Sequence, residues 1–269
     1  MSEIPRYILL EKAVGQTPLE CLELWRKDNP EFINTPLAYA GRLDPMASGL
    51  LLVLIGEECK NQTNYHHLDK EYEFEILFGT HSDSGDVLGI VKEVDNKTVS
   101  ESEIKNILQE FIGNMEVPYP IFSSKTVQGK PLHTWTMENR LHEITIPTRK
   151  SEIFELELLS HKTFSRKEIS EISLAKIETI PPVTDLRKAL GNDFRRPDIR
   201  IAWANFSKIG SPTDQFSIAK IRCLCSSGTY MRTLAEIIAE KLDSKGLAFS
   251  IHRTKIGHYK KETGLKRME

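Results

Sequence analysis

The sequence of 269 residues predicts a fold that combines β-strands with α-helices in one chain, and three observations indicate this. Residues 70–79 alternate between apolar and acidic side chains, which is the pattern of a half-buried strand. Residues 216–225 also alternate, with apolar side chains and both thiols of a Cys-x-Cys pair on one face. Residues 98–112 instead carry apolar side chains at helical spacing, behind a segment that can cap a helix.

The composition is that of an ordinary globular protein, with 39% hydrophobic and 28% charged residues. The length allows one large domain or two small ones, and the chain can bury a core. The formal net charge of −2 lacks the overall basicity of many nucleic-acid binders. Binding to RNA would therefore need a local basic patch.

Cysteine spacing and hydropathy indicate where the protein is found. The four cysteines show no disulfide-framework spacing, and residues 1–5 lack the features of a signal peptide. The longest apolar run, residues 50–55, is far shorter than the roughly twenty residues that span a bilayer. We expect a cytoplasmic protein without a membrane segment. The Cys-x-Cys pair has no third and fourth ligand nearby, so we also expect no metal site.

The first strand is predicted at residues 7–14, and the first helix follows it. Thr17 offers an N-cap, Pro18 suits the first helical position and Glu20 completes a capping box. This helix is expected to run through about Lys27.

The stretch around Asp44 stands out because a turn-forming loop leads directly into an uncharged apolar run. Pro45 biases Asp44 towards an extended conformation, and Gly41 and Gly49 relax the backbone on either side. Residues 50–55 then read as a buried strand. The loop would place one carboxylate beside the core. The alternative is that Asp44 only starts a turn, as Asp-Pro pairs often do.

The strand at residues 70–79 carries Tyr72 on its apolar face. A tyrosine there is either plain core, with a hydroxyl that needs a partner, or a functional residue. The polar loop at residues 79–89 is rich in Asp and Gly, which by itself predicts turns. A helix is expected next, with Gly113 as its stop. Its apolar positions are Ile104, Ile107, Leu108, Phe111 and Ile112.

Cations and aromatic side chains share the segment 117–150, where they could follow an RNA backbone and stack on bases. The cations are Lys125, Lys130, His133, Arg140, Arg149 and Lys150, and the aromatic residues are Phe122 and Trp135. The alternative is a solvated loop with scattered charges. A strand is predicted at residues 152–159.

The segment 161–214 contains only partial helical patterns, such as that of residues 186–190. A structureless loop of this length is unusual in a compact domain, so we expect an ordered structure. Further on, Arg232 lies in the first turn of a helix and off its apolar stripe. A cation there opposes the helix dipole by about 0.3–1 kcal/mol, so a nearby acid is favoured.

Residues 41–49 and 56–60 resemble the signature around the catalytic aspartate of the TruB family of tRNA pseudouridine synthases. They read Gly-Arg-Leu-Asp-Pro-Met-Ala-Ser-Gly and Gly-Glu-Glu-Cys-Lys. The family pattern is Gly-His-x-Gly-Thr-Leu-Asp-Pro-x-Ala-x-Gly, followed by Gly-Glu-Ala-Thr-Lys. This chain has Tyr39 in place of the usual His and Arg42 in place of Thr.

Further family motifs occur in the same order along the chain. They resemble Lys-x-Tyr at 70–72, Thr-Asp-Thr-x-Asp-x-x-Gly at 79–89, Pro-x-Tyr-Ser-Ala-x-Lys at 118–125, Cys-x-x-Gly-Thr-Tyr-Ile-Arg-Thr at 225–233 and Leu-Arg-Arg-Thr-x-x-Gly at 248–257. The resemblance covers residues 8–160 and 215–257.

The resemblance implies a role for each matching residue. Asp44 would be the catalytic carboxylate, Arg232 its ion-pair partner and Tyr72 the ring that packs against the target base. Tyr39 would stack in the space left by flipped bases. The full set of implied substrate-binding residues is Tyr39, Arg42, Asp86, Lys125, Lys130, Ile251 and Arg253.

The resemblance also implies the pseudouridine synthase fold, an α+β domain with a bent, mainly antiparallel mixed sheet, flanking helices and a central active-site cleft. The catalytic domain would span 1–258, interrupted by an insertion at about 161–214. Residues 259–269 would form a short basic tail, without room for a C-terminal PUA domain. The implied substrate is uridine 55 in the T-loop of tRNA. No cofactor and no obligatory protein partner are expected, and the protein would be a monomer.

The sequence leaves three other functions to be weighed against this one. A non-catalytic RNA-binding or tRNA-folding module would not need Asp44, Tyr72 and Arg232 together. A synthase could also act on a different structured RNA. A hydrolase that pairs Asp44 with Asp83 or Asp86 leaves Arg232 unexplained.

Overall fold

The fold is organised around a large mixed sheet. The computed structural model describes residues 5–93, 97–183 and 193–268. The strand order is β1-β3-β12-β4-β11-β10-β7, while β2 pairs with β3 and β13 with β12 off this path. The strands are β1 (Tyr7–Lys12), β2 (Leu37–Ala40), β3 (Ala47–Ile55), β4 (Asp69–Phe78), β7 (Gly113–Pro118), β10 (Thr148–Ser165), β11 (Gln215–Cys225), β12 (Gly246–Lys260) and β13 (Gly264–Arg267).

The sheet is mainly antiparallel, as predicted. Among the described residues, β3 and β12 form the parallel pair of this sheet, with Ile251 opposite Ala47 and Arg253 opposite Gly49. This pairing brings β3, the strand after Asp44, beside β12. The α+β class with flanking helices is therefore confirmed.

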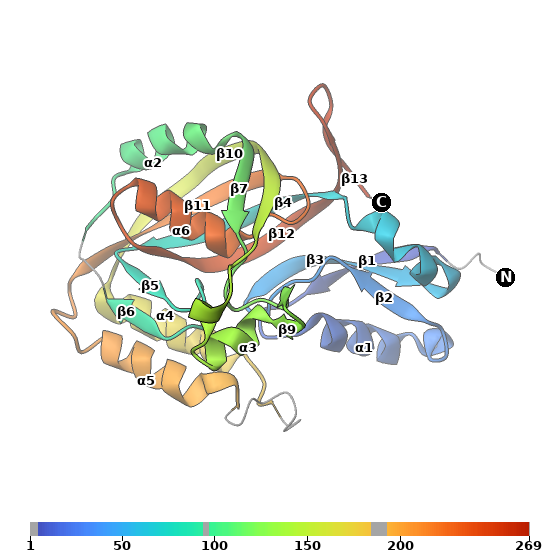
Figure 1. Ribbon diagram of the computed structural model, residues 1–269, viewed down its shortest axis with the longest axis horizontal. Coiled ribbons are helices and arrows are strands. Elements are labelled where there is room, and N and C mark those ends of the chain that lie inside the picture. The colour runs from blue at the N-terminus through green and yellow to red at the C-terminus, as the bar shows by residue number, and fades with distance from the viewer. Residues whose placement is uncertain (1–4, 94–96, 184–192, 269) are drawn as a thin grey trace.

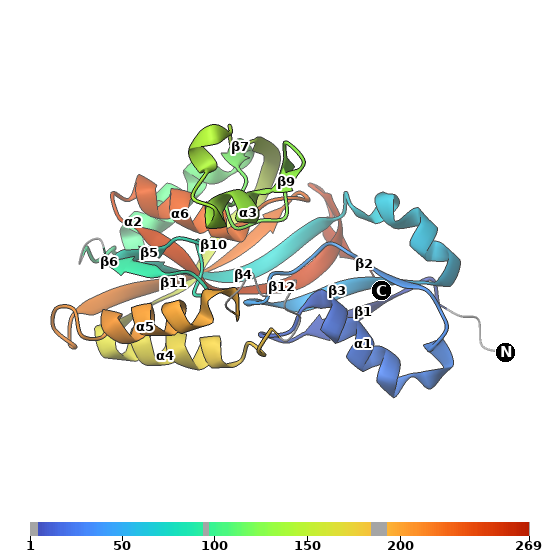
Figure 2. The same cartoon turned by 60° about the horizontal axis from the view of Figure 1, so that its bottom comes forward.

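Helices cover both faces of the sheet, as Figures 1 and 2 show from two directions. One face carries α2 (Glu101–Leu108) and α6 (Met231–Lys241), and the other carries α4 (Arg166–Glu178) and α5 (Arg196–Phe206). Helix α1 (Pro18–Asp28) packs beside β1 and β2. The site described below lies on the α6 side, under the segment that joins β7 to β10.

Alternation along the strands explains the two cores. On the α2 and α6 side, Phe74 and Ile76 of β4 and Ile221 of β11 are fully buried. On the other side, Leu77 of β4 packs in a cluster with Trp203 of α5. Because helices cover both faces at this end of the sheet, successive residues of one strand are buried alternately in the two cores.

Capping boxes set the start of three helices. Thr17 and Glu20 cap α1 as predicted, Ser100 with Glu103 caps α2, and Ser165 with Glu168 caps α4. Helix α2 ends at Leu108, however, and a short 3-10 turn follows. Ile112 has an extended backbone and is 44% exposed, so its predicted place on the apolar helix face is wrong. The helical pattern continued in sequence beyond the point at which the chain leaves the sheet face.

The region predicted as an insertion begins inside a strand. Strand β10 continues to Ser165, beyond the predicted end at residue 159, because Ser160–Ser165 pair with β11. Helices α4 and α5 follow and pack against each other. The partial helical pattern at residues 186–190 lies outside the described residues. Residues 259–269, which were predicted to form a short tail, are partly ordered as strand. Tyr259 and Lys260 end β12, and the chain then turns back and pairs with it as β13.

An excursion between β7 and β10 projects over the α6 side of the sheet (Figure 2). It contains β8 (Thr126–Val127), β9 (Lys130–Pro131) and α3 (Leu132–Met137). The two remaining short strands, β5 (Thr80–Ser82) and β6 (Val91–Glu93), form a hairpin beside α5. In the parts of the chain described, no helix is long and apolar enough to cross a membrane.

Candidate active site

Asp44 lies in a tight turn directly before β3. The Ala47 N–H donates to the Asp44 carbonyl at 3.0 Å, which closes the turn, and the Gly15 N–H donates to the Pro45 carbonyl at 2.9 Å. A Cβ at Gly49 would lie 2.3 Å from the Arg253 carbonyl oxygen, and Gly49 has φ +102°. Only glycine therefore allows β3 and β12 to approach this closely after the turn.

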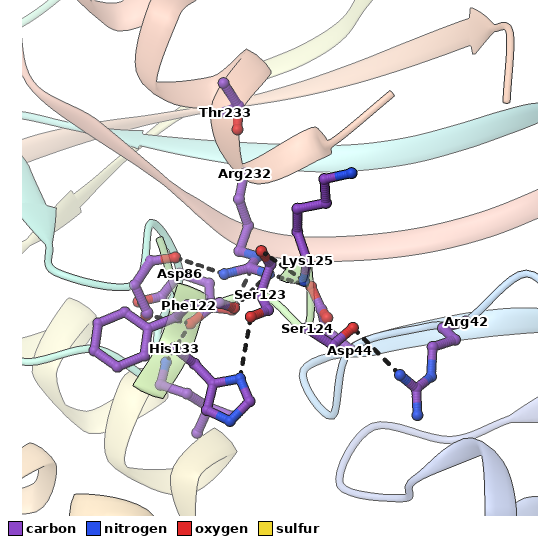
Figure 3. A network of polar contacts seen from close by, with 12 residues as sticks. Arg42, Asp44, Asp86, Phe122, Ser123, Ser124, Lys125, His133, Arg232 and Thr233 are labelled. Carbon is purple, nitrogen blue, oxygen red and sulfur yellow. Dashed lines mark hydrogen bonds and ion pairs between the residues drawn. The ribbon is translucent and has the colours of Figure 1, made fainter. Parts of the chain in front are cut away.

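Arg232 binds the Asp44 carboxylate. Its Nη2 lies 3.0 Å from Asp44 Oδ2, and the exposed fractions of the two side chains are 5% and 45%. Arg232 Nη1 donates to the Ser84 carbonyl at 2.8 Å and Nη2 to the Phe122 carbonyl at 3.2 Å. Figure 3 shows Arg232 reaching from α6 into this group. A buried, fixed cation thus holds a carboxylate that stays open to solvent.

Asp86 is the second carboxylate beside Arg232. Its Oδ2 lies 3.8 Å from Arg232 Nε, and it is 5% exposed. Asp86 Oδ1 accepts hydrogen bonds from the Ser84 hydroxyl at 2.7 Å and the Leu88 N–H at 2.9 Å. Burial raises the pKa of Asp86, although Arg232 opposes this. Burial lowers the pKa of Arg232, but Asp44 and Asp86 outweigh it and the net shift is upward.

Tyr72 and Ile251 lie in one apolar cluster with Leu43, the residue before Asp44. Tyr72 is 9% exposed and Ile251 7%. Burial raises the pKa of the Tyr72 phenol. The strands therefore bring the predicted base-binding residues next to the Asp44 turn.

Tyr39 lies partly buried near the end of β2, and Arg42 is exposed on the loop that follows. The Arg42 guanidinium carbon is 6.0 Å from the centre of the Tyr39 ring, and Arg42 Nη1 donates to the Ser124 hydroxyl at 3.3 Å. Lys125 lies nearby on the excursion, with its Nζ 5.0 Å from the centre of the Tyr119 ring. These side chains form an accessible rim around Asp44.

Lys130, which is predicted to bind substrate, lies in an ion pair within the excursion. Its Nζ lies 2.7 Å from the Glu138 carboxylate and 4.5 Å from the centre of the Trp135 ring. Arg140 also pairs with Glu138, at 3.0 Å. Glu138 therefore neutralises part of the positive charge of the excursion. The sequence alone did not indicate that this acid lies beside Lys130 and Arg140.

Arg253 also differs from its prediction as a substrate-binding residue. It is 1% exposed, and its guanidinium donates to the carbonyls of Leu50 at 2.6 Å and Gly41 at 3.0 Å. A longer contact of 3.5 Å reaches the Arg42 carbonyl. Arg253 thus supports the loop that carries Asp44, and its guanidinium is engaged by backbone carbonyls of that loop and of β3.

We expect Arg253→Lys to lower stability by about 1–3 kcal/mol, because one ammonium cannot satisfy the buried carbonyls that the guanidinium fork reaches. The salt dependence of RNA binding should not change, since no phosphate contact is lost. Urea unfolding and RNA titrations at several salt concentrations measure both effects. As a control, Lys125→Gln should reduce the salt slope by about one. A reduced salt slope for Arg253→Lys would instead show that Arg253 contacts RNA, as the sequence predicted.

Two ionisable groups near the site, the buried Lys12 and the partly buried Glu236, were missed by sequence reasoning. Burial lowers the pKa of Lys12 to about 8, and its Nζ donates to the carbonyls of Ala13 and Gln16 at 2.9 and 2.7 Å. Burial raises the pKa of Glu236 to about 7, against the field of Arg232. Glu236 lies one helical turn after Arg232, and this i, i+4 spacing is the signal that could have identified it.

No metal site is visible in the part of the chain that the structure describes, since no three His, Cys, Asp or Glu side chains are grouped closely enough. The polar groups that converge are instead Asp44, Arg232 and Asp86, with apolar residues beside them. This is an arrangement for holding an ionised carboxylate next to a flat, partly apolar ligand.

Comparison with known proteins identifies the class of protein. Residues 33–177 match the family model described as TruB family pseudouridylate synthase (N terminal domain). The crystal structure of a Cbf5-Nop10-Gar1 complex has the same fold, with a TM-score of 0.53 and 17% identity. That match covers 93% of this chain and 48% of the other. Fold and family model together define a pseudouridine synthase.

Two relatives resemble the chain over most of its length. The tRNA pseudouridine synthase B of Caldicellulosiruptor saccharolyticus is 32% identical over 210 residues, which cover 73% of this chain and 70% of the relative. The tRNA pseudouridine synthase 4 of Saccharomyces cerevisiae is 30% identical over 231 residues, which cover 77% and 57%. The chain belongs to the TruB family of pseudouridine synthases, as the sequence motifs predicted.

Proposed function

We propose that the protein converts uridine to pseudouridine in tRNA, at uridine 55 of the T-loop, with Asp44 as the catalytic carboxylate. The observation that carries this proposal is the pair in which a buried Arg232 holds a half-exposed Asp44 at 3.0 Å. The tRNA substrate is supported by the names of the relatives from Caldicellulosiruptor and yeast.

The reaction is an isomerisation. The bond from C1′ of the ribose to N1 of uracil breaks, the base rotates, and a bond from C1′ to C5 forms. The proton on C5 leaves to solvent while N1 gains one, so atoms balance without net oxidation or hydrolysis. The chemistry therefore calls for no redox cofactor. A carboxylate starts the reaction, and the ion pair with Arg232 holds Asp44 in place for it.

The target uridine must leave its stack before Asp44 can reach it, at a cost of a few kcal/mol. Tyr72 and Ile251 lie in the apolar cluster beside the Asp44 turn, and we assign them the two sides of the flipped base. A ring and a branched aliphatic side chain can offset part of the lost stacking.

The accessible rim supplies the proposed contacts to the rest of the RNA. Tyr39 would stack against neighbouring bases, while Arg42 and Lys125 would bind phosphates. Lys130 would have to exchange Glu138 for a phosphate. Asp86 serves the substrate through Arg232, because it is buried and already accepts hydrogen bonds from Ser84 and Leu88.

The finer organisation is part of the same proposal. The chain would act as a monomer in the cytoplasm, on the T-arm stem-loop, without an obligatory protein partner. Residues 161–214 would be an insertion in one catalytic domain. A protein that contacts RNA through one domain would bind weakly and with a steep salt dependence.

The test is release of tritium from unmodified tRNA that carries uridine labelled at C5, followed by mapping of the modified position. We expect release by the wild-type protein, with pseudouridine at position 55. Release mapped elsewhere would point to a different site or RNA. Binding without release, on several structured RNAs, would favour a non-catalytic tRNA-folding module.

A further inference from the structure

We propose that Arg195 is a positioning residue of this active site, which holds both segments that bind the Arg232 guanidinium. The inference deepens the proposed function and rests on it. Arg195 directly precedes α5, and it lies beyond residues 33–177, the part of the chain that matches the family model. No family motif assigns it a role.

The first contact of Arg195 is with the loop after β5. Its Nη1 lies 2.6 Å from Asp83 Oδ2 and its Nη2 lies 3.1 Å from Oδ1, which is a two-pronged ion pair. The side chains are 17% and 27% exposed, so solvent screens the pair only in part. Asp83 Oδ1 also accepts the Ile90 N–H at 2.9 Å, which ties the carboxylate to the base of its own loop.

The second contact of Arg195 is with the excursion. Its guanidinium carbon lies 4.3 Å from the centre of the Phe122 ring, within the range of a cation–π interaction. One side chain thus touches two segments that are far apart in sequence.

Both segments bind Arg232 through the backbone. The Ser84 carbonyl, one residue after Asp83, accepts from Arg232 Nη1 at 2.8 Å. The Phe122 carbonyl accepts from Arg232 Nη2 at 3.2 Å, and the same nitrogen pairs with Asp44. A shift of either segment would therefore move an acceptor of the arginine that orients the catalytic carboxylate.

Helix α5 has a second connection to the same loop. The buried Trp203 donates its indole N–H to the Val87 carbonyl at 3.0 Å. This bond fixes α5 against the loop independently of Arg195. Helix α5 is therefore fixed to the loop without Arg195, and Arg195 can hold the excursion in place from this helix.

The backbone of Arg195 supports a role beyond helix formation. It has φ +62°, a left-handed conformation that costs a non-glycine residue stability, and its side chain makes no cap for α5. Glycine would suit this backbone better. The contacts of the Arg195 side chain with Asp83 and Phe122 offset this conformational cost.

The backbone allows an experiment that separates stability from positioning. Arg195→Gly removes both contacts but relieves the left-handed strain, so we expect Tm to stay within a few degrees of wild type. We expect kcat for tRNA to fall about tenfold, the factor given by a loss of about 1.4 kcal/mol in transition-state stabilisation, with little change in KM. Arg195→Lys, which keeps one charge, should recover part of kcat.

The matched control is Arg200→Ala. Arg200 lies on the same helix and makes a similar two-pronged pair with Glu178, at 2.6 and 3.0 Å. It contacts neither the loop nor the excursion in the contacts described. We expect Arg200→Ala to keep the kcat of the wild-type protein. An equal loss of kcat in Arg200→Ala, or wild-type kcat in Arg195→Gly, would overturn the proposal.

A second readout needs no turnover. Amide hydrogen exchange should accelerate at residues 83–85 and 121–124 in Arg195→Gly and stay unchanged there in Arg200→Ala. Unchanged exchange in Arg195→Gly would overturn the proposal. Because exchange is measured without substrate, it separates failure of this inference from failure of the proposed function.

Discussion

Asp44→Asn is expected to abolish pseudouridine formation, with a loss of at least about 10⁴-fold in kcat, because an amide can act neither as nucleophile nor as base. The substitution preserves the shape of the side chain, and one oxygen can still accept from Arg232. The affinity for tRNA should stay close to wild type, since the proposed phosphate contacts lie on the rim. Tritium release and filter binding measure the two quantities.

Asp214→Asn is a matched control for Asp44→Asn. Asp214 is 25% exposed and pairs at 2.9 Å with Arg166, which is fully buried. The geometry resembles that of the Asp44 pair, but the carboxylate belongs to the α4 and α5 side of the sheet. We expect this variant to lose stability and keep kcat. Product formation by Asp44→Asn near the wild-type rate would rule out Asp44 as the catalytic carboxylate.

Arg232→Met is expected to have the second largest effect, because it removes the cation between two carboxylates. Loss of a positioned charged donor at an active site costs about 10²–10³-fold in kcat. Asp86 would remain buried without its counter-charge, so stability should fall by about 3–5 kcal/mol. Tritium release and urea unfolding measure these losses.

Adding Asp86→Asn to Arg232→Met separates the effect on stability from the effect on kcat. The double variant no longer has an unpaired buried charge, so its stability should recover in part while its kcat stays low. Full recovery of kcat in the double variant would show that Arg232 acts only by neutralising Asp86. That result would contradict a role of Arg232 in orienting Asp44.

The Arg232→Met variant should also gain a characteristic pH dependence. Burial raises the pKa of Asp86 in the folded protein, and removal of Arg232 takes away the charge that opposes this shift. A carboxyl with a raised folded-state pKa stabilises the fold when protonated, and this stabilisation is lost as pH rises through that pKa. Unfolding of the variant should therefore require more urea at pH 5 than at pH 8. Wild-type protein should show a smaller difference.

Local sequence determined much of the fold and the family. The capping box of α1 and the alternating faces of β4 and β11 depend on neighbouring residues, so spacing was sufficient to predict them. The family that the motifs predicted was confirmed by the match of residues 33–177 and by the relatives. The end of α2 was predicted wrongly, because helical spacing of apolar residues persists to Ile112 while the chain has already turned.

The site required the tertiary structure wherever a contact crosses between distant segments. Arg253 looked like an RNA-binding cation in sequence, but β12 turns it inward onto the Gly41 carbonyl. Lys130 is paired with Glu138, and Arg195 lies in a segment that no motif covers.

The sequence by itself determined which chemistry the chain carries, because Asp44, Tyr72 and Arg232 each stand in a recognisable local pattern. Only the tertiary structure decided which charges are open to a substrate and which support the site. The physical reason is that burial and pairing depend on partners up to about two hundred residues away, as with Arg253 and the Asp44 loop, and such distances leave no periodic signal in sequence.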